Sequence, residues 1–349
     1  MIKFFIDLVQ FLNSTAPLLT SLAIFTLLAI LLSKSIKKHA TIYYIVLAIP
    51  FALVAIPFIG RLLGVEMFNF NRIPFLGGIL RDYIHFGTFA FPILIIVMYT
   101  GALNPKIPWV KKLLNIRKEL SIISGFPVLT HALIRITNTF PRSLMYFTNN
   151  EEYMANARVT SELGTGISNF SFVLGIVLLA LFLPLWITSF KSVHKRMGKV
   201  KWKKWQKWSY PFYALLFIHA MGIQVGGLLS AREAARQAQA VEVTESAESS
   251  KGAKPETATV HNPGQGKQTN DSIMKPREAR PAATKVANQE QERGGRARSI
   301  GFADINVSRD VRRYIHITSL ILIFGSYLYL RLRKAKKDAA KRKSKIKII

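Results

Sequence analysis

Residues 203–227 read KKWQKWSYPFYALLFIHAMGIQVGG, a basic, tryptophan-rich head followed by an apolar segment that contains one histidine. The apolar part is long enough for a helix that crosses a lipid bilayer, which requires about 20 residues. Because hydrocarbon solvates an imidazole poorly, an ionisable side chain within a span usually faces the bundle interior and often has a function. The segment therefore predicts a membrane helix and marks His219 as a candidate site residue.

Similar apolar segments recur along the chain of 349 residues. In hydrocarbon the backbone must satisfy its own hydrogen bonds, so segments of this length are expected to be helices. The predicted fold class is all-α, a polytopic membrane helix bundle of about seven transmembrane helices. The predicted spans are 16–33, 41–60, 83–103, 119–138, 169–190, 208–229 and 313–330.

The formal net charge of +29 suits either a nucleic-acid-binding protein or a membrane protein. Lysines and arginines gather in 34–38, 106–118, 191–207 and 331–347, which fall on one side if seven helices are threaded in order. By the positive-inside rule, this side is the cytoplasm, so the N-terminus is predicted outside and the C-terminus inside a cell membrane. Nucleic-acid binding is the weaker interpretation, and anionic lipid headgroups are the expected partner of the basic tail.

The composition divides the chain into five parts. Residues 1–82 hold two N-terminal transmembrane helices and an outer loop, and 83–229 form the core that carries most candidate site residues. Residues 230–311 have almost no aromatic residues and are expected to be an outer insertion, disordered or weakly structured. Its first part, SAREAARQAQAVEV, is able to extend the preceding helix. A last transmembrane helix at 312–330 and a basic cytoplasmic tail at 331–349 follow.

The sequence also excludes several kinds of chemistry. The chain has no cysteine, which excludes thiolate metal ligands, Cys-ligated iron–sulfur clusters and disulfides. It has no Walker loop, no GxGxxG motif after a strand and no HExxH motif. A soluble nucleotide-binding domain is therefore not expected in this chain, and any redox chemistry must use other ligands.

Two histidines in the predicted spans have matched depth. His131 lies roughly 18 Å along the fourth span, and His219 lies roughly 15 Å along the sixth, at 1.5 Å per residue. Both helices are predicted to run outward. Two imidazoles at equal depth on separate helices are what axial ligation of a b-type haem requires, because each binds the iron from one face of the ring. The alternative is a structural hydrogen bond between helices.

The neighbours of this histidine pair suit a haem site. Arg135 lies one turn beyond His131 on the same helix face, where a guanidinium is able to neutralise a haem propionate. Gly222 and Gly226 follow His219 on nearly the same face, and their missing side chains would admit a flat macrocycle. The alternative for both glycines is the close packing of helices through small residues.

Two further histidines lie near the predicted outer boundary. His85 and His316 each fall in the first turns of an inward-running span. They are candidates to ligate a second, outer cofactor or to bind a quinone or an electron acceptor. The alternative is two interfacial imidazoles hydrogen-bonded to water or lipid. Three tryptophans at the opposite, cytoplasmic boundary favour an interfacial anchor belt: Trp202, Trp205 and Trp208.

Two stretches resemble a known family. NIRKELSIISGFPVLTHALIRI (115–136) and LPLWITSFKSVHKRMGKVKWKKWQKWSYPFYALLFIHAMG (183–222) are similar to the bacterial ferric-reductase-like transmembrane family. That family includes the haem-bearing membrane subunit of the periplasmic methionine sulfoxide reductase system. The resemblance covers about 83–229 and the seventh span. The matching residues are Arg117, His131, Thr188, Ser189, Trp202, Tyr210 and His219.

The resemblance implies a six-helix core that binds b haem and passes electrons across the membrane. Many two-haem relatives carry a second histidine about thirteen residues before the position of His219, where this chain has Gln206. The inner position on the fourth helix, around Arg117, is not histidine either. The resemblance therefore implies one haem b, held by His131 and His219. It also suggests a flavin such as FMN near the cytoplasmic face, with Arg117 as a phosphate contact; the alternative is that these cations only set the topology.

The expected function is transmembrane electron transfer by an oxidoreductase subunit. Because no flavin or nicotinamide domain is expected in the chain, a separate donor, either a cytoplasmic flavoprotein or a quinol, must supply electrons for an extracytoplasmic acceptor. The family name is no evidence that ferric iron is the substrate. The competing hypothesis is a non-redox membrane transporter or assembly scaffold on the same helical frame.

Overall fold

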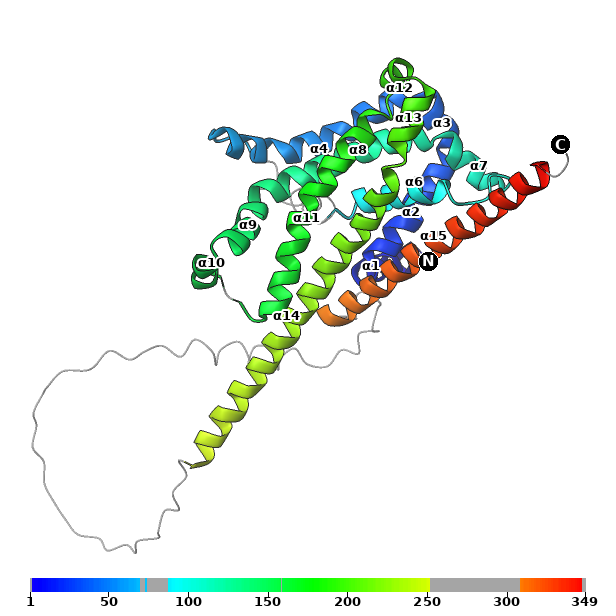
Figure 1. Cartoon of the computed structure of the whole chain (residues 1–349). Coiled ribbons are helices and arrows are strands. Elements are labelled where there is room, and N and C mark those ends of the chain that lie inside the picture. The colour runs from blue at the N-terminus through cyan, green and yellow to red at the C-terminus, as the bar shows by residue number, and fades with distance from the viewer. Residues whose placement is uncertain (1, 70–72, 74–86, 158, 252–307, 347–349) are drawn as a thin grey trace, which may run out of the picture.

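The computed structural model describes residues 2–69, 73, 87–157, 159–251 and 308–346. Within these residues the backbone forms helices joined by turns and irregular segments, and no strand (Figure 1). The all-α prediction is therefore confirmed.

Five helices are long and apolar enough to cross a membrane. They correspond to the predicted spans at 41–60, 119–138, 169–190, 208–229 and 313–330. Side chains on their outer faces are apolar and exposed, as expected of helices that contact lipid. The five are α4 (Ala40–Leu63), α8 (Arg117–Asn138), α11 (Glu162–Ile187), α14 (Ser209–Lys251) and α15 (Arg309–Ile346).

The other two predicted spans are shorter helices. α2 (Pro17–Leu31) has 15 residues and α6 (Ala90–Thr100) has 11, fewer than the roughly 20 that a full crossing requires. Within the described residues these two apolar stretches are helices bounded by turns, so a full crossing of the membrane by either stays a prediction. α6 is preceded by 74–86, outside the described residues, and is buried along most of its length. It is a central element of the bundle.

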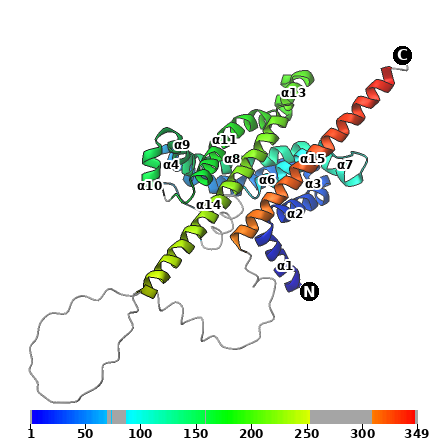
Figure 2. The ribbon, with the colours of Figure 1, turned by 60° about the horizontal axis from the view of Figure 1, so that its bottom comes forward.

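α11 packs mainly against α14 and also contacts α8 and α9 (Phe140–Thr148). α14 lies along α11, α8 lies along α4 and α6, and α15 packs on α14 (Figures 1 and 2). A cluster of buried apolar side chains from α6, α11, α14 and α15 fills the space between them, including Ile95, Phe182, Phe212 and Leu320. α1 (Ile2–Thr15) packs on α2 and was not expected as a separate helix.

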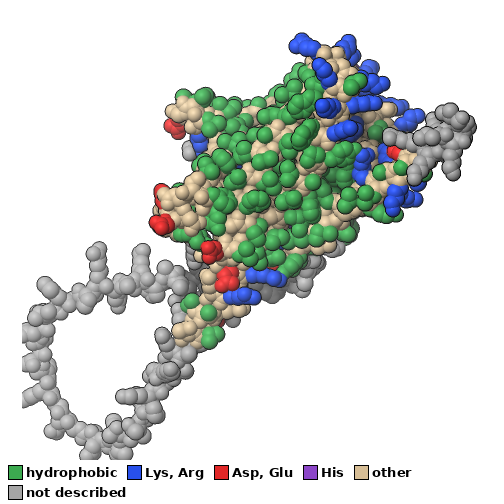
Figure 3. Space-filling model, in the orientation of Figure 1, with side chains coloured by type: hydrophobic (Ala, Val, Ile, Leu, Met, Phe, Trp, Pro, Cys, Tyr) green, Lys and Arg blue, Asp and Glu red, His purple; other side chains and the backbone are tan. Residues whose placement is uncertain are grey.

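Short helices close both ends of the bundle. Lysines and arginines gather at the end formed by α12 (Lys191–Met197) and α13 (Lys199–Gln206), and the visible acidic side chains lie mainly toward the opposite end (Figure 3). At the basic end, α3 (Ser33–Lys38) is tied to α7 (Pro108–Asn115), because the Nζ of Lys37 donates to the carbonyl of Asn115 at 2.9 Å.

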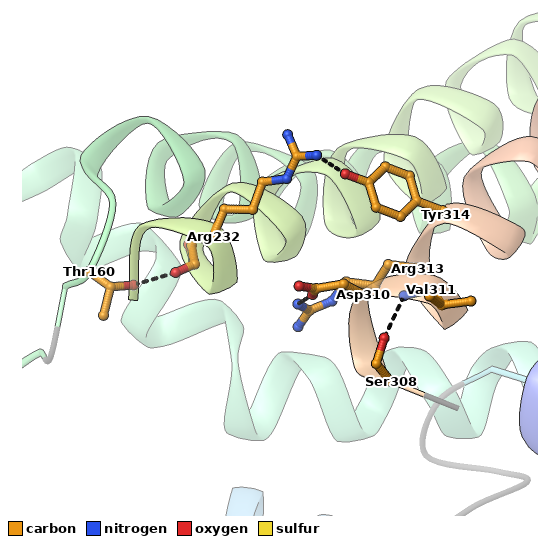
Figure 4. Close-up of polar contacts among 8 residues, drawn as sticks. Thr160, Arg232, Ser308, Asp310, Val311, Arg313 and Tyr314 are labelled. Atoms are coloured by element: carbon orange, nitrogen blue, oxygen red, sulfur yellow. Dashed lines mark hydrogen bonds and ion pairs between the residues drawn. The ribbon is translucent and has the colours of Figure 1, made fainter. Parts of the chain in front are cut away.

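The opposite end carries α9 (Phe140–Thr148) and α10 (Asn150–Asn156). Polar contacts there join α14 and α15 and fix the segment before α11 (Figure 4). Arg232 donates to the hydroxyl of Tyr314, and the Oγ1 of Thr160 donates to the carbonyl of Ser230 at 3.0 Å. The Oγ of Ser308 accepts from the Val311 amide at 3.3 Å and so caps α15.

α14 continues well beyond the apolar segment and projects away from the other helices (Figure 2). The helix ends at Lys251, so the SAREAARQAQAVEV segment extends the sixth span as expected. The rest of the predicted insertion, 252–307, lies outside the described residues, and its disorder stays a prediction.

Candidate functional site

His219 is held in one orientation by the neighbouring helix. Its Nδ1 lies 2.6 Å from the backbone carbonyl of Ser171 on α11. A carbonyl oxygen only accepts, so Nδ1 must carry the proton and Nε2 keeps its free lone pair. A Cβ added at Gly175, one turn along α11, would lie 3.3 Å from the Cε1 of His219. Ser171 and Gly175 therefore form a seat on which the ring is fixed with Nε2 as the available ligand atom.

His131 lies half-buried on α8 and is covered by a glycine. A Cβ added at Gly87 would lie 3.5 Å from both the Cε1 and the Nδ1 of His131. Gly87 has a φ of +72°, a conformation that residues with a side chain rarely adopt. The segment that enters α6 thus crosses close to the imidazole, and glycine satisfies both the backbone geometry and the close approach.

Arg135 connects α8 with α11 in the candidate site. Its guanidinium carbon lies 5.9 Å from the centre of the Phe172 ring on α11, a cation–π contact. Phe172 is the neighbour in sequence of Ser171, so the Arg135 side chain reaches the part of α11 that contacts His219. His131 lies one turn before Arg135, against the segment that enters α6.

Gly222 and Gly226 pack against α11. A Cβ at Gly222 would lie 2.0 Å from the Oγ of Ser171, and one at Gly226 would lie 2.3 Å from the Oγ of Ser168. In the direction that a Cβ would take, serine side chains of α11 occupy the space beside both glycines, whereas Gly222 also lines a cavity of about 810 Å³. The packing alternative describes both positions, because only glycine lets two helices approach this closely.

The outer histidines are not brought together by the described residues. His316 lies half-buried near the start of α15. His85 lies outside the described residues, so its pairing with His316 stays a prediction.

Gln206, near the basic end of the bundle, takes part in the contacts that cap α11. The Nε2 of Gln206 donates to the Oγ1 of Thr188 at 3.0 Å, and the indole Nε1 of Trp202 donates to the Thr188 carbonyl at 3.0 Å. These contacts fix α13 on the end of α11, because they satisfy groups that the last helical turn leaves free. Gln206 is therefore part of a structural clamp between α13 and α11.

Arg117 contacts the central helix α6. Its Nε donates to the carbonyl of Val97 at 3.2 Å, and the guanidinium lies beside Gly101. From α15, Arg331 and Lys334 both donate to the Gly101 carbonyl, at 3.1 and 2.8 Å. Three cations therefore stabilise the carbonyl end of α6, where the helix dipole is negative. The predicted phosphate contact of Arg117 would have to use its terminal guanidinium nitrogens.

Two functional candidates on α11 were not expected from the sequence, Ser171 and Gly175. A signal for them exists, because small residues recur on one face of this helix at intervals of four, three and four. The series is Gly164, Ser168, Ser171 and Gly175.

The requirements for binding haem differ from those for binding a bare metal ion. Within the described part of the chain, no group of three or more His, Asp or Glu side chains is placed to hold a metal ion. A haem needs only axial ligands from the protein, because the macrocycle supplies the other four nitrogens. Among the described contacts, His131 lies beside Gly87 at the entrance to α6, whereas His219 contacts Ser171 on α11, so the pairing of the two imidazoles on one haem stays a prediction.

Comparisons with known proteins give little information on function. No protein-family model matches the chain, and no solved structure matches it. An uncharacterized protein of Treponema pallidum (strain Nichols) is 27% identical over 204 residues, which is 56% of this chain and 50% of that protein. The chain thus spans about half the length of the curated relative that it matches. The chain is an all-α protein with membrane-spanning helices, and its function must be inferred from the site.

Proposed function

We propose that this protein is a membrane electron-transfer subunit that binds one haem b through His131 and His219. The observation that carries the proposal is the 2.6 Å contact between the Nδ1 of His219 and the Ser171 carbonyl. Metal-bound histidines almost always donate their other ring nitrogen to a carbonyl or carboxylate, which raises ligand basicity and fixes the ring. The same bond also fits the alternative, a structural link between α14 and α11, so the haem content of the purified protein decides between the two.

The residues around the pair have separate tasks in this proposal. The Ser171 carbonyl orients His219, and Gly87 lets the chain close over His131. Arg135 supplies a positive charge for a propionate. The apolar core of α6, α11, α14 and α15 excludes water and lowers the local dielectric constant. A bound haem supplies the reversible one-electron iron couple.

The electron path in this proposal runs outward. Gln206 and Arg117 are committed to helix ends, so the inner half of the bundle offers no second bis-histidine pair among its described residues. A cytoplasmic flavoprotein, with FMN for example, or a membrane quinol would donate to the haem. An extracytoplasmic acceptor would then receive the electron. Ferric ion is one acceptor among several that this path allows.

Visible spectroscopy of the detergent-purified protein from haem-replete cells tests the proposal. A Soret band and a reduced b-type α band are expected, with about one haem per chain in a pyridine haemochromogen assay. His131→Ala and His219→Ala should each lose the bands, while His39→Ala, an exposed histidine on the basic end, should keep them.

A colourless preparation would reject the redox assignment in favour of a non-redox transporter or scaffold. Two haems per chain would instead indicate that His85 and His316 form a second, outer pair.

A further inference from the structure

The α12–α13 hairpin is a rigid attachment to the end of α11. Besides the bonds of Trp202 and Gln206 to Thr188, the rings of His194 and Trp202 lie 4.7 Å apart, which joins α12 to α13. Gly198, with a φ of +78°, makes the turn between the two helices. The side chains on the outer face of this hairpin are therefore held in a fixed arrangement.

This hairpin is strongly and uniformly cationic. No Asp or Glu occurs in the sequence between Glu162 and Glu233, so no acidic residue of the hairpin or of the chain directly beside it offsets its charge. The cations form the densest part of the blue surface in Figure 3. They are Lys191, Lys195, Arg196, Lys199, Lys201, Lys203, Lys204 and Lys207.

Exposed aromatic residues lie directly beside these cations. Trp205 is 44% exposed, Trp208 is 51% exposed and Tyr210 is 48% exposed. In the sequence these aromatic residues come just after Trp202, which is bonded to Thr188. They therefore lie near the end of α11 and the start of the apolar part of α14. Ile187, the last residue of α11, is 46% exposed at the same level. Indole and phenol rings prefer this boundary between hydrocarbon and headgroups.

We propose that the α12–α13 hairpin is a binding surface for anionic phospholipids of the leaflet that it faces. The exposed rings enter the boundary region, and the lysines of α13 then lie at the depth of the phosphates. Charge complementarity favours an anionic headgroup over a zwitterionic one, at about fivefold in affinity for each cation near the surface. An acidic protein would match the charge equally well, but it gives no reason for exposed tryptophans at the ends of two spans. This proposal is independent of haem binding.

Lipid titration of the purified full-length chain in neutral detergent tests the surface. Phosphatidylglycerol should raise the melting temperature and remain bound in native mass spectrometry, whereas phosphatidylcholine should do neither. The variant Lys201→Gln/Lys203→Gln/Lys204→Gln removes three exposed cations from α13. Its apparent affinity for phosphatidylglycerol should fall about fivefold per lost charge. All three side chains are exposed, so the variant should melt like the parent without added lipid.

A matched control removes the same charge from the same end of the molecule. Arg333→Gln/Lys336→Gln/Lys337→Gln changes three exposed cations on α15, which extends beyond the bundle without a comparable clamp. These cations belong to the basic tail, whose expected partner is also anionic lipid, so this variant should lose part of the phosphatidylglycerol response, but less than the α13 variant, whose cations lie beside exposed aromatic rings. Equal losses in both variants, or no preference for phosphatidylglycerol in the parent, would overturn the proposal. The proposal would also be overturned if the hairpin bound an acidic cytoplasmic protein in nanodiscs of zwitterionic lipid and the protein showed no preference for anionic lipid.

Discussion

At the scale of single residues, the most informative contact is made by a backbone atom. The Ser171 carbonyl determines which nitrogen of His219 carries the proton, and Gly175 determines how close the ring lies to α11. Neither residue is itself a metal ligand. In the proposed haem site both residues would act through His219, so a change beside the proposed ligand should be as instructive as a change of the ligand itself.

Gly175→Val tests this seat without removing either histidine. A Cβ alone would lie 3.3 Å from the Cε1 of His219, so the added methyl groups should displace the ring from its bond to Ser171. Haem content per chain should drop strongly, or the haem midpoint potential should shift.

Gly325→Val on α15 is the matched control, because nothing lies within 4 Å of a Cβ there. Unchanged haem content and potential in Gly175→Val would show that the seat does not position a ligand.

At the scale of elements, the central feature is the contact between α11 and α14. It is built from small residues, with Gly164, Ser168 and Ser171 on one helix and Gly222 and Gly226 on the other. In a membrane, such surfaces associate through close van der Waals contact, because lipid tails offer no competing hydrophobic effect. The same close approach brings His219 within hydrogen-bonding distance of the α11 backbone.

Neighbouring glycines allow a sharp test of this interface. Gly226→Ala places a Cβ 2.6 Å from the Gly164 carbonyl, and backbone cannot move aside cheaply. The free energy of unfolding should fall by about 1–3 kcal/mol, as is usual for overpacking. Gly227→Ala places its Cβ 3.5 Å from Arg313, an ordinary contact, and should be neutral or slightly stabilising. Denaturation in detergent by circular dichroism measures both; equal stability of the two variants would contradict the packing role of Gly226.

At the scale of the whole molecule, charge is separated between the two ends of the bundle (Figure 3). The basic connections, α3, α7, α12 and α13, close one end, and the α14 extension projects from the other (Figure 2). Membrane insertion retains lysine- and arginine-rich loops in the cytoplasm. The expected orientation therefore places α13 inside the cell and the α14 extension outside.

Thiol labelling of intact cells measures this orientation, since the chain has no cysteine of its own. Ala238→Cys on the α14 extension should react with a membrane-impermeant maleimide in intact spheroplasts. Val200→Cys on α13, where the native side chain is 84% exposed, should react only after the membrane is opened. The reverse pattern would invert the topology and place the lipid-binding hairpin on the outer leaflet.

The sequence by itself determined the helical class, the five long apolar helices and the extension of α14, because hydropathy and helical length are properties of contiguous residues. It also identified His131, Arg135 and His219 as unusual polar groups in apolar segments. The crossing of the membrane at α2 and α6 stays a prediction, because both helices are short within the described residues. Only the tertiary structure decided which helix touches which.

In the tertiary structure, Gly222 and Gly226 pack against α11, and Gln206 donates a hydrogen bond to Thr188. The Ser171 carbonyl contacts His219 in the same way, across two helices. Ser171 lies 48 residues before His219 in the chain. A hydrogen bond at that separation depends on how two helices pack, and no local pattern of apolar and polar residues contains that information.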